Sequence, residues 1–163
     1  MHRTHLVSAA CVSLWLAALA GHQAASATAP SAALRAHLKD ERFGIVTSIR
    51  GLPLGVREAL QELFGGSSLD IAEPGAEFQA TDVVVNPRLP SRRLVAAACS
   101  TDHCLVYYER GGIAHRWYVT LYHWTPAATR FELGGVARGG LATIGDIRNA
   151  ALSGELKSPA GSW

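Results

Sequence analysis

Apolar and polar residues alternate most regularly between residues 92 and 133. Such alternation is the pattern of β-strands whose two faces meet different surroundings. Gly111 and Gly112 interrupt it and supply the positive φ angles that a tight two-residue hairpin turn requires. The pattern therefore predicts an antiparallel β-meander. Its four strand-like runs cover residues 92–99, 104–110, 113–124 and 129–133.

Apolar residues recur at helical spacing on both sides of this meander. Val56 and Leu60 lie on one face of a helix predicted over residues 53–64, which two glycines end. Thr143 is the expected N-cap of a second helix over residues 143–152. Shorter runs predict a third helix and two further strands, at residues 34–40, 43–49 and 78–85. We therefore expect an α+β fold in which an antiparallel β-meander of four to six strands packs with two or three helices.

The first 27 residues have the three parts of a secretory signal peptide. Arg3 lies in a short basic start, an uncharged apolar run covers residues 6–20, and small residues end at Ala27. We expect cleavage after Ala27 and no stable membrane span afterwards, because a spanning helix needs about 20 apolar residues. A retained membrane anchor is the alternative. The predicted location is periplasmic or secreted.

Cleavage would leave one domain of nearly balanced charge. The chain has 163 residues, with 15 Lys and Arg against 13 Asp and Glu, and Arg3 is the one charged residue before residue 28. This balance excludes the basic field of a nucleic-acid-binding protein, and an apolar content of 48% excludes a disordered chain. The predicted division is a signal peptide at 1–27, a flexible or partly helical lead-in at 28–41, a single α+β domain at 42–156 and a C-terminal tail at 157–163.

Two cysteines remain after the predicted cleavage, Cys99 and Cys104. They flank the loop of the first hairpin, where directly opposed residues are close enough for a disulfide. An exported chain with two cysteines favours that bond, which would fix the register of the hairpin and the shape of its loop. The alternative is a reactive thiol at Cys104 beside Asp102 and His103, although the spacing is not that of a Cys-x-x-Cys redox pair.

The sequence lacks the spacing patterns of familiar catalytic sites. It contains no Gly-x-Ser-x-Gly, no phosphate-binding Gly-rich loop, no His-Glu-x-x-His and no Cys/His zinc pattern. We therefore expect no cofactor, and a binding protein more than an enzyme. The alternative is a small metal-binding or hydrolytic envelope enzyme that uses His103 with His123, or His103 with acidic residues. His123 is the one histidine that the predicted register leaves as a neighbour of His103.

The predicted two-residue turn divides the meander into two faces. It pairs Tyr108 with His115, so that one face is mainly apolar and packs against helices. The opposite face collects aromatic residues, and an exposed amphipathic surface of this kind is typical of recognition sites. The alternative is that residues 34–64 cover this face. The candidate binding residues on it are Tyr107, Arg116, Tyr118, Tyr122 and Trp124.

The segment Cys99-Ser-Thr-Asp-His-Cys104, its continuation to Trp117 and the closing residues 141–147 resemble small exported proteins of Gram-negative bacteria. The resemblance covers about residues 45–155 and implies location and domain extent, but no chemistry. We expect an exported non-catalytic binding or interaction protein of the bacterial cell envelope. Its partner would be a protein or an envelope ligand, contacted through the aromatic face or the hairpin tip. A purely structural accessory domain is a further alternative, and the oligomeric state is left open.

Overall fold

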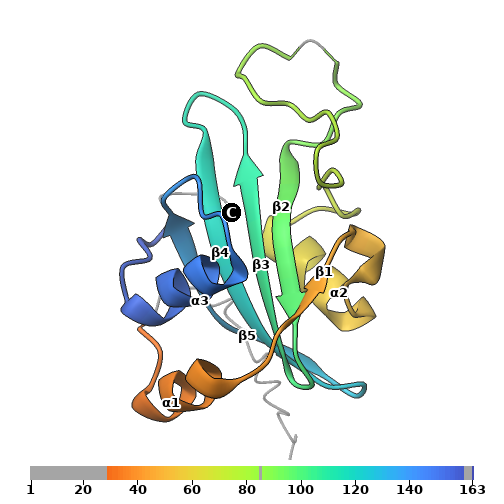
Figure 1. Ribbon diagram of the computed structural model, residues 1–163. Helices are drawn as coiled ribbons and strands as arrows, with labels where there is room; N and C mark the ends of the chain where they lie inside the picture. Colours follow the sequence, from red (N-terminus) through yellow and green to blue (C-terminus); the bar gives the residue numbers. More distant parts are fainter. Residues whose placement is uncertain (1–28, 85, 160–162) are drawn as a thin grey trace, which may run out of the picture.

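The computed structural model describes residues 29–84, 86–159 and 163. Five strands form one antiparallel sheet in which neighbours in sequence are neighbours in space (Figure 1). The predicted meander is therefore confirmed, whereas the predicted signal peptide at residues 1–27 lies outside the described residues. The strands are β1 (Gly44–Val46), β2 (Arg92–Cys99), β3 (His103–Arg110), β4 (Arg116–Trp124) and β5 (Thr129–Ala137).

In the described part of the chain, three α-helices cover the two faces of this sheet (Figure 1). α2 (Leu54–Phe64) packs on one face, where Val56 is buried, whereas α1 (Ala32–Asp40) and α3 (Ile144–Ser153) pack on the other, where Leu38 is buried. Because both faces are covered, the sheet is the middle layer of an α+β domain, and the predicted fold class is confirmed. Among the described residues, no helix is both long and apolar enough to cross a membrane.

The helix ends follow from local sequence. Thr143, predicted as an N-cap, accepts a hydrogen bond from the Asp146 N–H, and the Asp146 carboxylate accepts one from the Thr143 N–H. Gly65 ends α2 with a φ of 69°, a left-handed conformation that glycine adopts without steric cost. A 3₁₀ turn at Ile49–Gly51 precedes α2. These end signals agree with the predicted helices, so the bounds of α2 and α3 differ from the prediction by one residue at most.

The connection between β3 and β4 is longer than the predicted two-residue turn. It extends from Gly111 to His115, so Tyr108 pairs with Tyr118. Gly111 lies so close to a distant loop that a Cβ there would approach the Gln79 carbonyl oxygen at 1.8 Å. The Gly112 N–H donates to the Ala80 carbonyl at 3.3 Å, so this segment bonds to that loop before β4 begins. The register shifts by three residues, an odd number, so β4 side chains lie on the face opposite to the predicted one.

Residues 78–84 belong to the loop before β2, so the predicted strand over 78–85 is wrong for its described part. The Gln79 N–H donates to the Pro90 carbonyl at 2.8 Å, a loop contact rather than a sheet ladder. β1 is shorter than the strand predicted at residues 43–49. The long loop rises above the sheet beside the β3–β4 connection (Figure 1).

The end of the chain, predicted as a tail, contributes to the packed structure. Lys157 pairs with Val136 of β5. This strand extends to Ala137, beyond the end predicted at residue 133. Trp163 is buried in the α2 core, and its carbonyl oxygen accepts a hydrogen bond from Nε of Arg92 at 3.1 Å. At least part of the predicted tail therefore belongs to the domain.

Candidate metal centre

The residues predicted as an aromatic binding surface do not share an exposed face. Tyr107 is buried on the side of α1 and α3, whereas Tyr118 and Tyr122 are buried beneath α2. Burial raises the pKa of Tyr122 above its usual value. Arg116 and Trp124, at the two ends of β4, are partly exposed. The expected exposure is therefore wrong because helices cover both faces of the sheet. The alternative of cover by residues 34–64 holds for Tyr118 and Tyr122, which lie beneath α2.

The predicted disulfide between Cys99 and Cys104 is confirmed and closes the turn between β2 and β3. The two residues pair directly in the ladder, with Cα atoms 4.1 Å apart and sulfur atoms 2.09 Å apart. Inside the turn, the Ser100 N–H donates to the His103 carbonyl at 2.7 Å, and the Ser100 hydroxyl accepts from the His103 N–H at 2.9 Å. The turn therefore presents Asp102 and His103 with little freedom.

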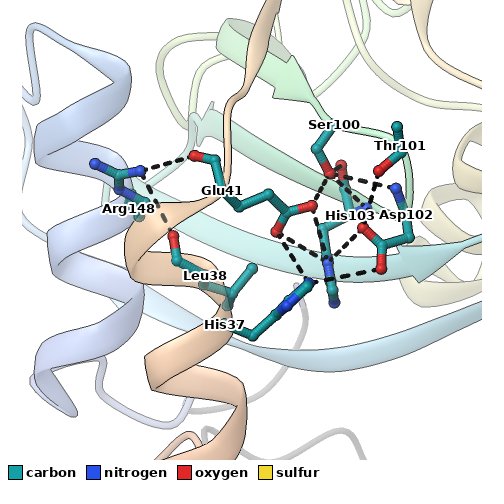
Figure 2. A network of polar contacts seen from close by, with 8 residues as sticks. All are labelled: His37, Leu38, Glu41, Ser100, Thr101, Asp102, His103 and Arg148. Atoms are coloured by element: carbon teal, nitrogen blue, oxygen red, sulfur yellow. Dashed lines mark hydrogen bonds and ion pairs between the residues drawn. The ribbon is translucent and has the colours of Figure 1, made fainter.

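Four side chains from two distant segments converge at this turn, and we call them the α1–hairpin cluster (Figure 2). Asp102 and His103 come from the hairpin, whereas His37 and Glu41 come from the end of α1. His103 Nδ1 lies 3.1 Å from Glu41 Oε2 and 3.4 Å from Asp102 Oδ1. His37 Nε2 lies 3.7 Å from Glu41 Oε2 and 3.6 Å from Asp102 Oδ2. One donor atom from each residue lies within 4.8 Å of all the others.

The spacing of these atoms is close to the spacing of ligands around a single metal ion. Zinc makes bonds of about 2.0–2.2 Å to imidazole nitrogen and carboxylate oxygen, which places neighbouring ligands about 3.3–3.6 Å apart. The four nitrogen–oxygen distances, from 3.1 to 3.7 Å, lie near this range, although Asp102 contributes a different oxygen to each of its two distances. With one donor atom from each residue, all separations are within 4.8 Å, so the side chains would close slightly around an ion. Two carboxylates also balance the charge of a divalent ion. The cluster is therefore chemically suited to a divalent transition metal.

The Glu41 carboxylate has a buried oxygen that no hydrogen bond satisfies. Its side chain is 9% exposed, and Oε2 accepts no hydrogen bond from the described residues, although two imidazoles lie within ion-pair distance. Oε1, by contrast, accepts a hydrogen bond from the Ser100 hydroxyl and lies 3.3 Å from His103 Nδ1, in hydrogen-bond contact. An unpaired buried polar group costs about 1–3 kcal/mol, and a charged one costs more. A cation held between Oε2 and the imidazoles would remove that cost.

One half of the α1–hairpin cluster is buried and the other half faces solvent. The side chains of Glu41 and His103 are 9% and 4% exposed, whereas those of Asp102 and His37 are 37% and 53% exposed. The side-chain hydrogen bond with Glu41 holds the pKa of Asp102 below its usual value, and the charges of His103 and His37 act in the same direction. Asp102 and His37 form the exposed side of the cluster, from which an ion would enter.

Arg148 and His123 support the cluster from neighbouring elements. Nη1 of Arg148, on α3, donates to the backbone carbonyl of Glu41 at 3.1 Å and so fastens the end of α1 (Figure 2). His123 pairs with His103 across β3 and β4, and their ring centroids are 5.3 Å apart. The predicted neighbourhood of these two histidines is confirmed, but His123 is not a member of the cluster. His37 lies equally near His103, so the prediction of a single histidine neighbour is wrong.

Sequence reasoning missed His37 and Glu41. Both lie in the segment predicted as a lead-in, and their approach to His103 depends on how α1 packs against the hairpin. The signal that was available is their spacing: residues four positions apart lie on the same face of a helix and point to the same partner. That spacing alone is common, so only the folded arrangement distinguishes this pair.

A second buried carboxylate, Glu109 on β3, has its partners among protein side chains, and we call this group the Glu109 network. Arg93 approaches Oε1 with Nε at 2.7 Å and Nη2 at 2.6 Å. His115 Nε2 lies 2.7 Å from Oε2. Arg93 also covers the Phe78 ring, and His115 stacks on Trp117. Both carboxylate oxygens are therefore satisfied, and the network needs no ion.

Comparisons with known proteins add no homologue. No family model matches the sequence, and neither a curated protein nor a solved structure matches it. The functional argument therefore rests on the geometry and chemistry of the α1–hairpin cluster.

Proposed function

We propose that this chain is an exported, non-catalytic metal-binding protein of the bacterial cell envelope, which holds one divalent ion of the zinc class in the α1–hairpin cluster. The observation that carries the proposal is the buried, unpaired Oε2 of Glu41. It converges with donor atoms of His37, Asp102 and His103 at the spacing of metal ligands. Export is inferred from the signal-peptide pattern of residues 1–27.

The donor set selects the class of ion. Imidazole nitrogens suit zinc, copper and related transition metals, whereas magnesium and calcium prefer oxygen ligands alone. The α1–hairpin cluster supplies no sulfur ligand, the donor that favours Cu(I). Cu(II) binds such donors tightly but prefers a square-planar arrangement. A set of four nitrogen and oxygen donors therefore makes zinc the first candidate.

Four protein donors favour holding a metal over using it in catalysis. Structural zinc sites fill all four positions with side chains, whereas catalytic sites keep one position for water or substrate. A hydrolytic enzyme, the alternative from the sequence, would need one donor to leave the ion. Asp102 and His37 are the exposed pair, so we infer that the ion enters and leaves past them.

A binding role through the aromatic face loses its support, because Tyr107, Tyr118 and Tyr122 are buried. The tip of the β2–β3 hairpin remains as a binding region. The ligand that we propose there is the metal ion itself. We therefore still propose a binding protein, but the binding surface is the hairpin tip and not the aromatic face.

Direct metal titration tests this function. The whole chain is produced with its own leader and without an affinity tag, then purified from the cell envelope or the medium. After dialysis against a chelator, calorimetric titration with zinc is expected to show one equivalent per chain. The intact mass of the same sample reports whether the chain begins after Ala27.

A matched pair of histidine variants is the control. His103→Ala removes a ligand and is expected to weaken zinc binding on the order of a hundredfold or more. His115→Ala removes an imidazole from the Glu109 network and is expected to leave the affinity unchanged. Circular dichroism checks that both variants are folded. A parent chain that binds no zinc, or equal losses in both variants, would contradict the proposal.

A further inference from the structure

The disulfide and two of the four proposed ligands share one turn. Cys104 directly follows His103, and the bond from Cys99 to Cys104 closes the turn that carries Asp102. The cystine packs in the core beneath α2, whereas the His103 side chain meets Glu41 on the other side of the sheet. The bond is therefore next to the ligands along the chain without being a ligand itself.

The two halves of the α1–hairpin cluster are held in different ways. Arg148 fastens Glu41 to α3, away from the disulfide. On the hairpin, the Trp124 N–H donates to the Asp102 carbonyl at 2.9 Å, so β4 holds one side of the turn. On the other side, where β2 ends, the disulfide acts together with the Ser100–His103 hydrogen bonds and the pairing of Cys99 with Gly44 of β1. Opening the disulfide would therefore loosen the turn while β3 stays paired with β4.

We propose that the Cys99–Cys104 disulfide sets the zinc affinity of this site, so that its reduction weakens binding and promotes release of the ion. The inference rests on the proposed function. A closed turn presents Asp102 and His103 already ordered, whereas an open turn must be ordered when the ion binds. Coupling between two sites commonly changes affinity 5- to 150-fold, and we expect about tenfold because β4 still holds the turn.

The reductant that this switch requires is a dithiol, which opens disulfides by exchange. Cys104 is buried and Cys99 is partly exposed, so a thiolate of the reductant attacks Sγ of Cys99. Cys104 leaves as a thiolate and takes up a proton, and a mixed disulfide joins Cys99 to the reductant. The second thiol of the reductant then displaces Cys99 as a thiol. Two electrons and two protons pass to the cysteines, and the reductant becomes a disulfide.

Zinc affinity in a variant without the disulfide tests the coupling. Competition with a chromophoric chelator compares the oxidised chain with the double variant Cys99→Ala/Cys104→Ala. The alanines open the turn without leaving thiols, which would bind zinc themselves. We expect a Kd about tenfold weaker in the double variant. The matched control is Val56→Ala, which destabilises the α2 layer away from the turn and is expected to leave the Kd unchanged.

Access of a reductant to the disulfide is tested separately. The folded chain is exposed to dithiothreitol and then to iodoacetamide, and mass spectrometry counts the labels. We expect both Cys99 and Cys104 to be labelled while the circular dichroism spectrum stays that of the folded protein. A chain that remains unlabelled would overturn the switch.

The outcomes separate the two proposals. An oxidised chain that does not bind zinc overturns the proposed function and this inference with it. An oxidised chain that binds zinc no more tightly than the double variant overturns the redox coupling alone. An equal increase of the Kd for zinc in Val56→Ala would show that any loss of stability weakens binding, and this result would also overturn the coupling.

Discussion

Two buried carboxylates near opposite ends of β3 have different kinds of side-chain partner. Glu109 receives Arg93 on one oxygen and His115 on the other, so the protein satisfies it completely. Among the described residues, no arginine pairs with the carboxylate of Glu41. Its Oε1 contacts Ser100 and His103, whereas Oε2 faces two imidazoles without a hydrogen bond from those residues. Both residues are glutamates with little exposed side chain. Protein side chains contact both carboxylate oxygens of Glu109, whereas Oε2 of Glu41 has no hydrogen bond from the described residues.

The difference shows that burial of a carboxylate does not by itself indicate a metal site. Arg93 gives Glu109 a permanent positive charge, because a guanidinium does not lose its proton in proteins. The imidazoles beside Glu41 carry a positive charge only when protonated, whereas they bind a metal ion in the neutral form. A divalent ion would supply to Glu41 the charge that Arg93 supplies to Glu109.

The largest expected effect is a crossed pair of glutamine variants. Glu41→Gln is expected to weaken zinc binding on the order of a hundredfold, because it removes a charged ligand and keeps the shape of the side chain. Glu109→Gln is expected to leave zinc affinity unchanged and to lower the free energy of unfolding by about 2 kcal/mol. That loss is below the value for a fully buried pair because the Arg93 side chain is 31% exposed. Zinc titration and urea unfolding of each variant measure the two effects, and equal losses of zinc affinity would break the comparison.

Zinc itself is expected to stabilise the fold by a comparable free energy. A ligand at about 100 times its Kd raises the free energy of unfolding by about 2.7 kcal/mol when only the folded state binds it. Urea unfolding with and without zinc measures this gain, and a chelator is expected to reverse it. Glu109→Gln should keep the gain and His103→Ala should lose it. A gain that survives in His103→Ala would place the ion elsewhere.

Arg148→Ala tests the anchoring of α1. Removal of the bond to the Glu41 carbonyl is expected to weaken zinc binding about tenfold, as is common for residues that position a metal ligand. Arg148→Lys keeps one donor and is expected to restore part of the affinity. Chelator competition gives both Kd values, with calorimetry confirming that the number of sites stays the same. Unchanged affinity in Arg148→Ala would show that α1 is held by other contacts.

The smallest effect is expected at His123. Phenylalanine keeps an aromatic ring against His103 but offers no donor atom, so His123→Phe should change the Kd by no more than about threefold. The same competition assay measures it. A loss as large as that of His103→Ala would make His123 a ligand and would revise the cluster.

Local signals predicted the parts of the fold that local chemistry decides. The bounds of β2 agree with the prediction because its alternating residues lie between clear turn signals. The register of β4 was not predictable from two glycines, because the approach of Gly111 to Gln79 is a contact between distant loops. One wrong turn length then placed Tyr118 and Tyr122 on the wrong face.

The site was predictable only for its half on the hairpin. The paired cysteines predicted a rigid turn, and His103 inside it was a candidate ligand. Glu41 and His37 were not predicted because nothing in their own segment shows that α1 packs against that turn. The hydrogen bond from Arg148 of α3 to the end of α1 joins residues far apart in the sequence, so no local pattern contains it.

X-ray absorption spectroscopy of the zinc-loaded, oxidised chain tests the central claim most directly. The account predicts four nitrogen and oxygen ligands at about 2.0–2.2 Å, with the outer-shell scattering of two imidazoles and no sulfur. Loss of one imidazole signal in His103→Ala would assign that ligand. A sulfur shell, an all-oxygen shell or a spectrum that His103→Ala leaves unchanged would contradict the assignment of the metal to the α1–hairpin cluster.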